Sequence, residues 1–538
     1  MKKLFLAVLS LLMVVSLAAC GGSDNNGGNE TTGPKVMNCN VGFSPDTFDP
    51  QASNVLENAI VTNQIYDYLL RENGKGEFEP ALAESYTVSE DGTVYTFTLR
   101  EGLTFEDGSP LTAADVAFSY ERGLDPNNAF DYAYQMYYIK NGAAFNAGEC
   151  AAEDLGLEVV DDRTLVVTLE SPTAYFASLT GFNTFGVVSK AYVEGCETYG
   201  VDENSTLASG PFKVAEFVKD QYVKFVKNEN YWDAANVKLD EVYMYAVTDS
   251  STEVSMYETD KLDFTFMSMG TADSMRFASE GTLKTWSSLN TRYVMVNHQK
   301  EVLQNVNVRK ALVLALDRKA LAENVVTNSV AAGGWIPAGM AAVDDPTKLF
   351  READFLPESG DVAEAQRLLA EAGYPNGEGF PTTLELVYTT SDANKVLAEA
   401  IVEMWRQNLG ITVIAQNLEG TVRRDRKNTG DYDFSLDGWS TDYLDPYSFF
   451  EVFETGNMYN QANYSNTEYD KCLNTAKNSN DQTVRQQAMT EAEKIWMEDM
   501  ASLPLYVSTK SYLEKDYVTG VVRSLMGQYD MKWADVNK

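Results

Sequence analysis

Residues 80–125 read PALAESYTVSEDGTVYTFTLREGLTFEDGSPLTAADVAFSYERGLD and carry the signals on which the fold prediction rests. Tyr86–Val88 and Val94–Leu99 are rich in aromatic and β-branched residues, and the turn sequence Glu90-Asp91-Gly92 lies between them. Two such runs joined by a short turn that contains glycine are typical of a β-hairpin. The stretch therefore predicts an antiparallel pair of strands.

A helix and a second hairpin follow this first pair. Thr112 and Asp115 have the spacing of a helix N-cap and a first-turn acid, which predicts the start of a helix. Leu157–Leu169 (LEVVDDRTLVVTL) then predicts another hairpin, which turns at Asp161-Asp162-Arg163. Taken singly, these hairpins would fit any secreted β-rich domain.

The order and spacing of these elements resemble the extracellular solute-binding proteins of family five, the oligopeptide- and dipeptide-binding components of ATP-binding-cassette (ABC) importers. Asn307–Arg318, which opens a helix, is similar to the same family. The resemblance covers roughly residues 35–538. It implies an α/β, two-lobed, periplasmic-binding-protein-like fold (class C, Venus-flytrap) with mixed sheets and an extra subdomain in lobe one.

The chain has 538 residues, 44% of them hydrophobic, so it is long enough to bury the cores of two lobes. Val242–Val247, a helix from about Ser250 and Asp260–Phe264 predict a strand, helix, strand unit, and Tyr293–Asn297 is a candidate strand that crosses between the lobes. The family resemblance implies that lobe one is assembled from both chain ends. We expect residues 35–75, 207–290 and 510–538 to form the core of lobe one, 76–206 its inserted subdomain and 291–509 lobe two.

The N-terminal segment reads as a bacterial lipoprotein signal. Residues 1–19 contain Lys2 and Lys3, then an apolar run, then small residues, a pattern typical of a removable export signal. Leu17-Ala18-Ala19-Cys20 resembles the lipobox, in which the cysteine is diacylated and becomes the new N-terminus. Glycine- and asparagine-rich residues then predict a flexible tether, so that 20–34 comprises the lipidated Cys20 and this tether.

The charge balance excludes several kinds of partner. The chain has 42 basic and 79 acidic residues, a formal net charge of −37. Nucleic acid and bare anionic phospholipid would be repelled from most of such a surface. We therefore expect neutral or cationic partners, and attachment to a membrane through the lipid rather than through charge.

Four cysteines remain besides Cys20, namely Cys39, Cys150, Cys196 and Cys472. Export permits disulfides, and four cysteines allow three complete pairings. We place a bridge between Cys150 and Cys196 first because both fall within one predicted lobe. The alternative is four free thiols.

Few catalytic or metal-binding patterns are present. His298 is the only histidine, and the sequence contains no G-x-S-x-G, no H-E-x-x-H and neither glycine-rich phosphate-binding fingerprint. One histidine without a C-x-x-C pair cannot build a His-rich or cysteine-based metal site. We expect no enzyme, no cofactor and no metal. A secreted glycosidase that uses paired carboxylates is the outside alternative.

The candidate binding site lies in residues 431–446, DYDFSLDGWSTDYLDP. The stretch begins as an alternating, aromatic-rich strand and ends in a loop closed at Pro446, with Trp439 and Asp442 three residues apart. An indole that excludes water beside an isolated carboxylate suits a bound ammonium group. The alternative is a core Trp439 above a solvated Asp442.

The family resemblance assigns roles within this stretch. Peptide binders of the family carry G-W-x-x-D in the second lobe, where the aspartate pairs with the peptide N-terminus and the intervening residues supply backbone partners. A first-lobe loop meets the peptide from the opposite side. The residues thus implied to bind the ligand are Gly438, Trp439, Ser440, Thr441 and Asp442 in lobe two and Asn54 and Val55 in lobe one.

Together these features predict a lipid-anchored protein at the outer face of the cytoplasmic membrane, at the cell surface or in the periplasm. It would capture oligopeptides or dipeptides between its lobes and deliver them to the permease subunits of an ABC importer. We expect a monomer that binds no nucleic acid. Relatives carry nickel chelates, sugars or other small molecules, so a different solute on the same fold is the alternative. Arg426 and Lys427 are candidates for reading the ligand's C-terminus, although a solvated helix face also explains this basic run.

Overall fold

The two predicted hairpins lie side by side in one four-stranded sheet. The computed structural model describes residues 33–53, 55–73, 77–267, 269–326, 329–345 and 347–538. β4 (Ala83–Val88) pairs with β5 (Val94–Leu99), β5 with β7 (Thr164–Thr168) and β7 with β6 (Leu157–Asp161), all antiparallel. Both hairpin predictions are confirmed.

α2 (Ala113–Leu124) begins where the sequence predicts a helix start. The backbone N–H of Thr112 donates to Oδ2 of Asp115 at 3.0 Å, so the first-turn acid closes the helix end. Three further short helices of this segment are α3 (Gly142–Asn146), α4 (Phe176–Leu179) and α5 (Lys190–Gly195).

A second four-stranded sheet contains the N-terminal strand. β1 (Val36–Asn40) runs parallel to β10 (Glu241–Tyr245), which pairs antiparallel with β9 (Tyr222–Lys227), and β9 pairs with β8 (Phe212–Val218). The helices of this region are α1 (Leu56–Ile65), α6 (Ser250–Glu258) and α7 (Thr271–Glu280).

The prediction that Asp260–Phe264 forms the second strand of a strand, helix, strand unit is wrong. After α6, Phe264 makes two isolated bridges, one parallel to Cys39 and one antiparallel to Glu514, but Asp260–Phe264 does not form a strand. The carboxylate of Asp263 accepts from the backbone N–H of Asn38 at 2.6 Å and thereby takes the place of a strand carbonyl. A side chain thus replaces part of the backbone ladder.

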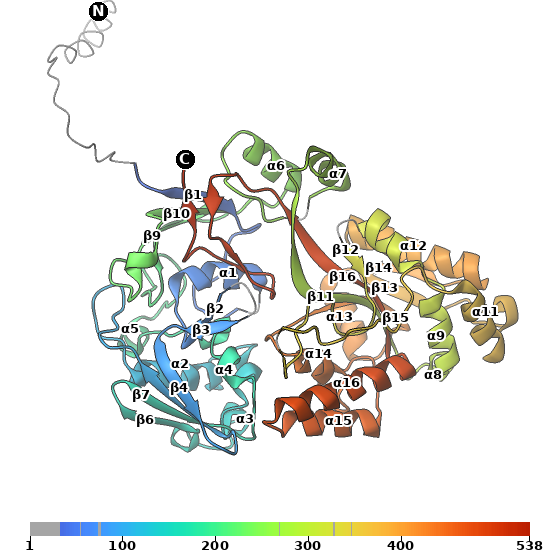
Figure 1. Cartoon of the computed structure of the whole chain (residues 1–538), viewed down its shortest axis with the longest axis horizontal. Helices are drawn as coiled ribbons and strands as arrows, with labels where there is room; N and C mark the ends of the chain where they lie inside the picture. Colours follow the sequence, from blue (N-terminus) through green and yellow to red (C-terminus); the bar gives the residue numbers. More distant parts are fainter. Residues whose placement is uncertain (1–32, 54, 74–76, 268, 327–328, 346) are drawn as a thin grey trace, which may run out of the picture. The chain divides into compact units, whose positions relative to one another are not determined.

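Two long strands run next to each other in a third, six-stranded sheet (Figure 1). β11 (Lys284–Val296) pairs antiparallel with β16 (Ser502–Tyr512), with irregular register between Ser287 and Thr291. The candidate crossing strand at Tyr293–Asn297 is therefore the end of a longer one. The sheet is completed by β12 (Ser329–Ala331), β13 (Glu385–Thr389), β14 (Ile414–Leu418) and β15 (Phe434–Ser440), in the order β12-β16-β11-β15-β13-β14.

The helices α8 to α16 lie between the strands of this sheet in sequence. In α12 (Asp392–Leu409) the helical spacing of four apolar residues predicts a core stripe: Leu397, Ile401 and Trp405 are buried, whereas Met404 is half-buried. The Trp405 indole N–H donates to the carbonyl of Leu312 at 2.8 Å. These helices are α8 (Glu301–Gln304), α9 (Val306–Leu314), α10 (Arg318–Ala320), α11 (Val362–Glu371), α12 (Asp392–Leu409), α13 (Gly420–Asn428), α14 (Tyr447–Phe450), α15 (Thr467–Lys477) and α16 (Gln482–Asp499).

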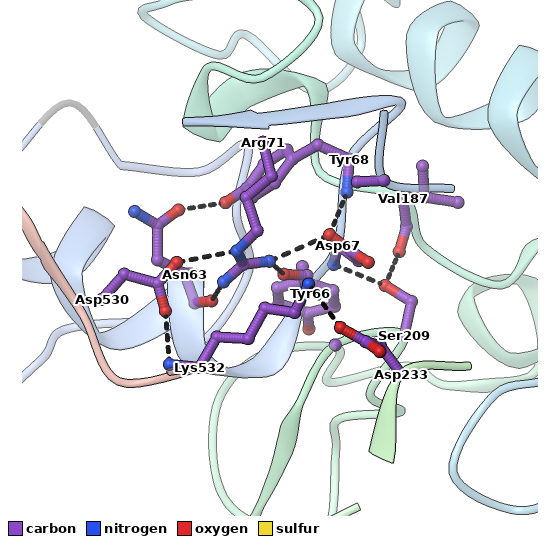
Figure 2. A network of polar contacts seen from close by, with 12 residues as sticks. Asn63, Tyr66, Asp67, Tyr68, Arg71, Val187, Ser209, Asp233, Asp530 and Lys532 are labelled. Carbon is purple, nitrogen blue, oxygen red and sulfur yellow. Dashed lines mark hydrogen bonds and ion pairs between the residues drawn. The ribbon is translucent and has the colours of Figure 1, made fainter. Parts of the chain in front are cut away.

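A buried polar network ties the end of the chain to its beginning (Figure 2). Arg71 follows α1 in β2 (Leu70–Glu72), a strand that pairs with β3 (Phe78–Pro80). The Arg71 guanidinium pairs with Asp67 at 2.9 Å and with Asp530 at 2.7 Å. The short C-terminal strands are β17 (Val518–Thr519), β18 (Val522–Arg523), β19 (Tyr529–Asp530) and β20 (Asp535–Val536).

The predicted disulfide is not formed. Cys150 and Cys196 both have free thiols. Each follows a different short helix, α3 and α5 respectively, and the Cys150 Sγ faces the carbonyl oxygen of Asn141 at 3.9 Å. The structure thus agrees with the alternative of free thiols for this pair.

The predicted export signal and the lipidation site Cys20 lie outside the described residues. Among the residues that are described, no helix combines the length and the apolar character needed to cross a bilayer. Residues 35–538 cluster as one unit.

Candidate ligand-binding site

β15 carries the predicted motif along the six-stranded sheet. It pairs with β11 over its whole length, from Phe434 opposite Val296 to Ser440 opposite Asn290. On its other edge, β13 pairs only with Phe434 and Ser435. Beyond Ser435, no strand of the described residues pairs with that edge. An unpaired edge of this kind is a template for an extended chain.

Gly438 leaves room for the side chain of an arginine on the neighbouring strand. Arg292 lies directly opposite it on β11. A Cβ atom on Gly438 would lie 2.9 Å from Cδ of Arg292 and 3.0 Å from its Nη1, so the Arg292 side chain would have to move. The glycine therefore lets the Arg292 side chain cross the strand.

One serine holds both Trp439 and Asp442 in place. The Trp439 indole N–H donates to the backbone carbonyl of Ser448 at 2.9 Å, and the Asp442 backbone N–H donates to the Ser448 hydroxyl at 3.0 Å. Ser448 is buried in α14, directly after the turn at Pro446. The loop therefore presents the indole and the carboxylate together, as the sequence predicts.

These two side chains line one cavity of about 410 Å³. One wall comes from a distant part of the chain, from which the Tyr134 hydroxyl donates to Oδ2 of Asp442 at 3.3 Å. From residues 76–206 the lining comprises Tyr134, Tyr137, Tyr138, Glu170 and Ser171; from residues 291–509 it comprises Trp439, Asp442, Glu451, Val452, Asn457, Met458, Tyr459 and Lys477.

The Asp442 carboxylate lacks a cation. No basic side chain of the described residues forms an ion pair with it, and its partners are the side chains of Tyr134 and Gln135. Burial raises the pKa of Asp442 to about 6, against the opposing effect of these hydrogen bonds. An ammonium group brought into the cavity would supply the missing charge.

Asp437, five residues earlier, has the opposite environment. Its carboxylate is buried but pairs with Arg423 at 2.8 Å and with Lys427 at 2.7 Å, both from α13. Burial alone would raise the pKa of Asp437, but the two cations lower it well below its usual range. Arg426 pairs with Glu385 at 2.9 Å. Both basic residues that are candidates for reading the ligand's C-terminus, Arg426 and Lys427, therefore already have a carboxylate partner within the protein.

The remaining predicted residues lie outside the cavity lining. Ser440 is exposed and its hydroxyl accepts from the Asn290 amide at 2.8 Å. The Thr441 backbone N–H already donates to the carbonyl of Leu289 at 3.0 Å. Val55 precedes α1 and is 38% exposed, and Asn54 falls outside the described residues.

The cavity contains residues that the sequence argument missed. Tyr134 belongs to a short 3-10 helix, η1 (Ala133–Met136), about 300 positions before Asp442 in the chain. The signal that was available is the tyrosine-rich run YAYQMYY at 132–138. Glu451 and Tyr459 come shortly after Asp442 in the chain, but they belong to no sequence motif that would predict a role in binding.

His298 has a structural environment. Its Nε2 lies 2.8 Å from the carbonyl oxygen of Ala501, and burial lowers the pKa of the imidazole to about 4. Within the described ranges, no group of three or more histidine, cysteine, aspartate or glutamate side chains is placed to hold a metal ion.

Comparison with known families decides the class of protein. Residues 77–461 match the bacterial extracellular solute-binding proteins, family 5 (middle region). The chain belongs to this family. This family-five solute-binding protein is 32% identical to the oligopeptide-binding protein OppA of Bacillus subtilis, over 98% of both chains, and 31% identical to the dipeptide-binding protein DppE of the same organism, over 100% and 99%.

Solved structures extend the likeness to the fold. Peptide-bound OppA of Listeria monocytogenes superposes on the family-five protein with a TM-score of 0.76 at 32% identity, covering 94% of this chain and all of the other. The predicted two-lobed, periplasmic-binding-protein-like fold with mixed sheets is therefore confirmed. Proteins of the family are solute-binding components of transporters rather than enzymes.

Proposed function

We propose that this chain is a lipid-anchored peptide-binding protein, which captures oligopeptides or dipeptides and delivers them to the permease of an ABC importer. The observation that carries the proposal is the unpaired Asp442 carboxylate in an aromatic cavity of about 410 Å³. The names of the relatives, which bind oligopeptides and dipeptides, support a peptide as the solute.

The α-ammonium group of a peptide is the cation that fits Asp442. It would form a charge-assisted hydrogen bond with the carboxylate, which is roughly twice as strong as a neutral one. The Trp439 indole excludes water from one side of that bond. The Leu436 carbonyl of β15 already accepts from Arg423 at 3.1 Å, so the part of the unpaired β15 edge after Leu436 would offer backbone groups to the extended chain that follows the ammonium group.

A ligand at Asp442 would contact two distant segments of the chain. Tyr134 comes from residues 76–206 and Asp442 from residues 291–509, which we propose as a subdomain of lobe one and as lobe two. A ligand that contacts both lobes favours the arrangement in which they meet, so that binding and closure are coupled. In this proposal the permease recognises the liganded arrangement.

Anchoring is assigned to the N-terminal segment. In the proposal, residues 1–19 are removed, Cys20 is diacylated and residues up to 34 form the tether. The lipid holds the protein at the outer face of the cytoplasmic membrane. Labelling cells with a radioactive fatty acid tests this part, because Cys20→Ala should abolish the label.

Recovery of the natural solute tests the binding site. The purified protein is denatured in guanidinium, and the released solutes are identified by mass spectrometry. We expect peptides with a free N-terminus. If the retained solutes carry no amine, the proposal is refuted.

The recovered peptides are then synthesised with free and with acetylated N-termini and measured by calorimetry. Asp442→Asn should weaken binding of the free peptide by about 2–5 kcal/mol, the usual cost of truncating one partner of a buried charge pair. Acetylation should cause a similar loss in the unchanged protein. Asp425→Asn, at an exposed position of α13, is the charge-matched control and should bind normally. Equal affinity of Asp442→Asn and the unchanged protein would remove this residue from the site.

A further inference from the structure

The cavity contains a second carboxyl group that recognition of an α-ammonium group does not use. Glu451 lines the same cavity as Asp442, at the start of the 3-10 helix η7 (Glu451–Phe453). Its Oε1 accepts a hydrogen bond from the Tyr443 hydroxyl at 2.8 Å. Among the described residues, its Oε2 accepts no hydrogen bond and no basic side chain pairs with it.

The surroundings of Glu451 favour a cation. Tyr134, Tyr138, Trp439 and Tyr459 contribute aromatic rings to the walls, and aromatic faces attract positive charge. Burial raises the pKa of Glu451 to about 8, and the charge of Asp442 adds to this effect. The carboxyl group is therefore costly to ionise until a cation arrives.

The lysine that lines the cavity does not form an ion pair with Glu451. Lys477, at the end of α15, lines the cavity but pairs with no carboxylate of the described residues. It only partly offsets the acids that share the walls, Asp442, Glu451 and Glu170. One ligand ammonium at Asp442 would leave Glu451 without a partner.

We propose that Glu451 binds a second cation of the ligand, the side chain of a lysine or arginine at the first position of the peptide. This inference rests on the proposed function, in which Asp442 takes the α-ammonium group. A volume of about 410 Å³ lies within the range of small-ligand pockets, about 300–1,000 Å³. The protein would thus select for basic first residues.

Several charged or titratable groups act on Glu451 and bear on its pH dependence. Ionisation of Glu451 is needed for the ion pair, so each pH unit below its pKa costs up to about tenfold in the affinity for a basic first residue. The direct effect of titrating Asp442 on the bound α-ammonium group cancels when two free peptides are compared, whereas its effect on the pKa of Glu451 remains in the ratio. The groups that act on Glu451 are Tyr443, Asp442, Glu454, Lys477, Tyr138, Tyr175, Tyr447 and Tyr459.

The test compares Lys-Ala-Ala with norleucine-Ala-Ala, which has the same side-chain length without the charge. Calorimetry at pH 6 and pH 8 gives the ratio of the two affinities. We expect the lysine peptide to bind about tenfold tighter at pH 8, with a smaller ratio at pH 6. A ratio of one or less at both pH values would overturn the inference without the use of any variant.

Variants locate the effect. In Glu451→Gln the ratio should fall toward one, while Glu451→Asp should keep part of it; Glu301→Gln, at an exposed position of α8, is the charge-matched control. An unchanged ratio in Glu451→Gln would refute the role of Glu451. Failure of the proposed function would be seen in a different measurement. Acetylated norleucine-Ala-Ala would then bind as well as the free peptide, whatever the first side chain contributes.

Discussion

Replacing Asp442 by asparagine should stabilise the ligand-free protein at neutral pH, although the same change should abolish tight binding. The carboxylate is ionised in the unfolded chain above its ordinary pKa of 3.8, whereas burial in the cavity raises the pKa to about 6. The folded state therefore binds the proton more tightly than the unfolded state. The contribution of Asp442 to stability is greatest below pH 4 and is lost as the pH rises from 4 to 6. Asparagine resembles the neutral acid and avoids this loss.

The size of the effect follows from the pKa shift. A shift of about two units corresponds to about 3 kcal/mol. Asp442 is half-buried, so screening by water reduces this to about 2–3 kcal/mol. The entropy of unfolding of residues 35–538 is about 1 kcal/mol per kelvin, which converts the gain to a rise of about 2–3 °C in Tm.

Calorimetric scans of ligand-free protein at pH 4 and pH 7 measure this rise. Retained solute must first be removed by unfolding in guanidinium and refolding, because a bound peptide stabilises the unchanged protein and reverses the sign. We expect Asp442→Asn to have the higher Tm at pH 7 and no advantage at pH 4. The control Asp425→Asn should match the unchanged protein at both.

A lower Tm for Asp442→Asn at pH 7 in the absence of ligand would refute the reasoning. It would mean that the ionised carboxylate is stabilised in the folded protein, by water or by its hydrogen bond from Tyr134, rather than held there at a cost. A Tm gain of the same size at pH 4 and pH 7 would show that charge is not its cause.

Two other substitutions should destabilise the protein. Asp437→Asn leaves Arg423 and Lys427 without their buried partner and should cost about 3–5 kcal/mol, seen as a lower Tm, in contrast to the gain at the neighbouring site. Arg71→Met leaves two buried carboxylates of the network in Figure 2 unpaired and should cost a similar amount by chemical denaturation, whereas Arg424→Met at an exposed position should stay within about 0.5 kcal/mol. A loss below about 1 kcal/mol for either buried change would contradict the assigned ion pairs.

The parts of the fold that the sequence predicts best are those whose partners are close in the chain. The hairpin of β4 and β5 closes over a few residues, and Gly92 has the positive φ of 68° that its turn requires. The start of α2 depends only on Thr112 and Asp115. In each case the residues that determine the local structure also make its hydrogen bonds.

Predictions fail where a distant side chain replaces a local rule. Asp263 takes the place of a strand carbonyl, and a pattern that predicts a strand yields only two isolated bridges at Phe264. The basic run of α13 pairs with Asp437 on β15, a contact that helical spacing alone does not contain. Tyr134 reaches Asp442 from another segment, so local periodicity predicts only one wall of the cavity.

The contrast between Asp437 and Asp442 is the physical reason for which we propose Asp442, and not Asp437, as a binding residue. Asp437 lies on β15 and Asp442 follows it by two residues, and burial acts on both. The fold provides two cations for Asp437 and thereby fixes it as a structural ion pair. For Asp442 it provides only weaker hydrogen-bond donors and an open cavity. An ionised carboxylate without a cation is costly in a partly buried place, so it raises the free energy of the unliganded protein. A ligand cation bound at Asp442 would lower that free energy again. In the function proposed above, the ligand supplies this missing charge, and the preference for amines that we propose follows from the lack of a protein cation at Asp442 among the described residues.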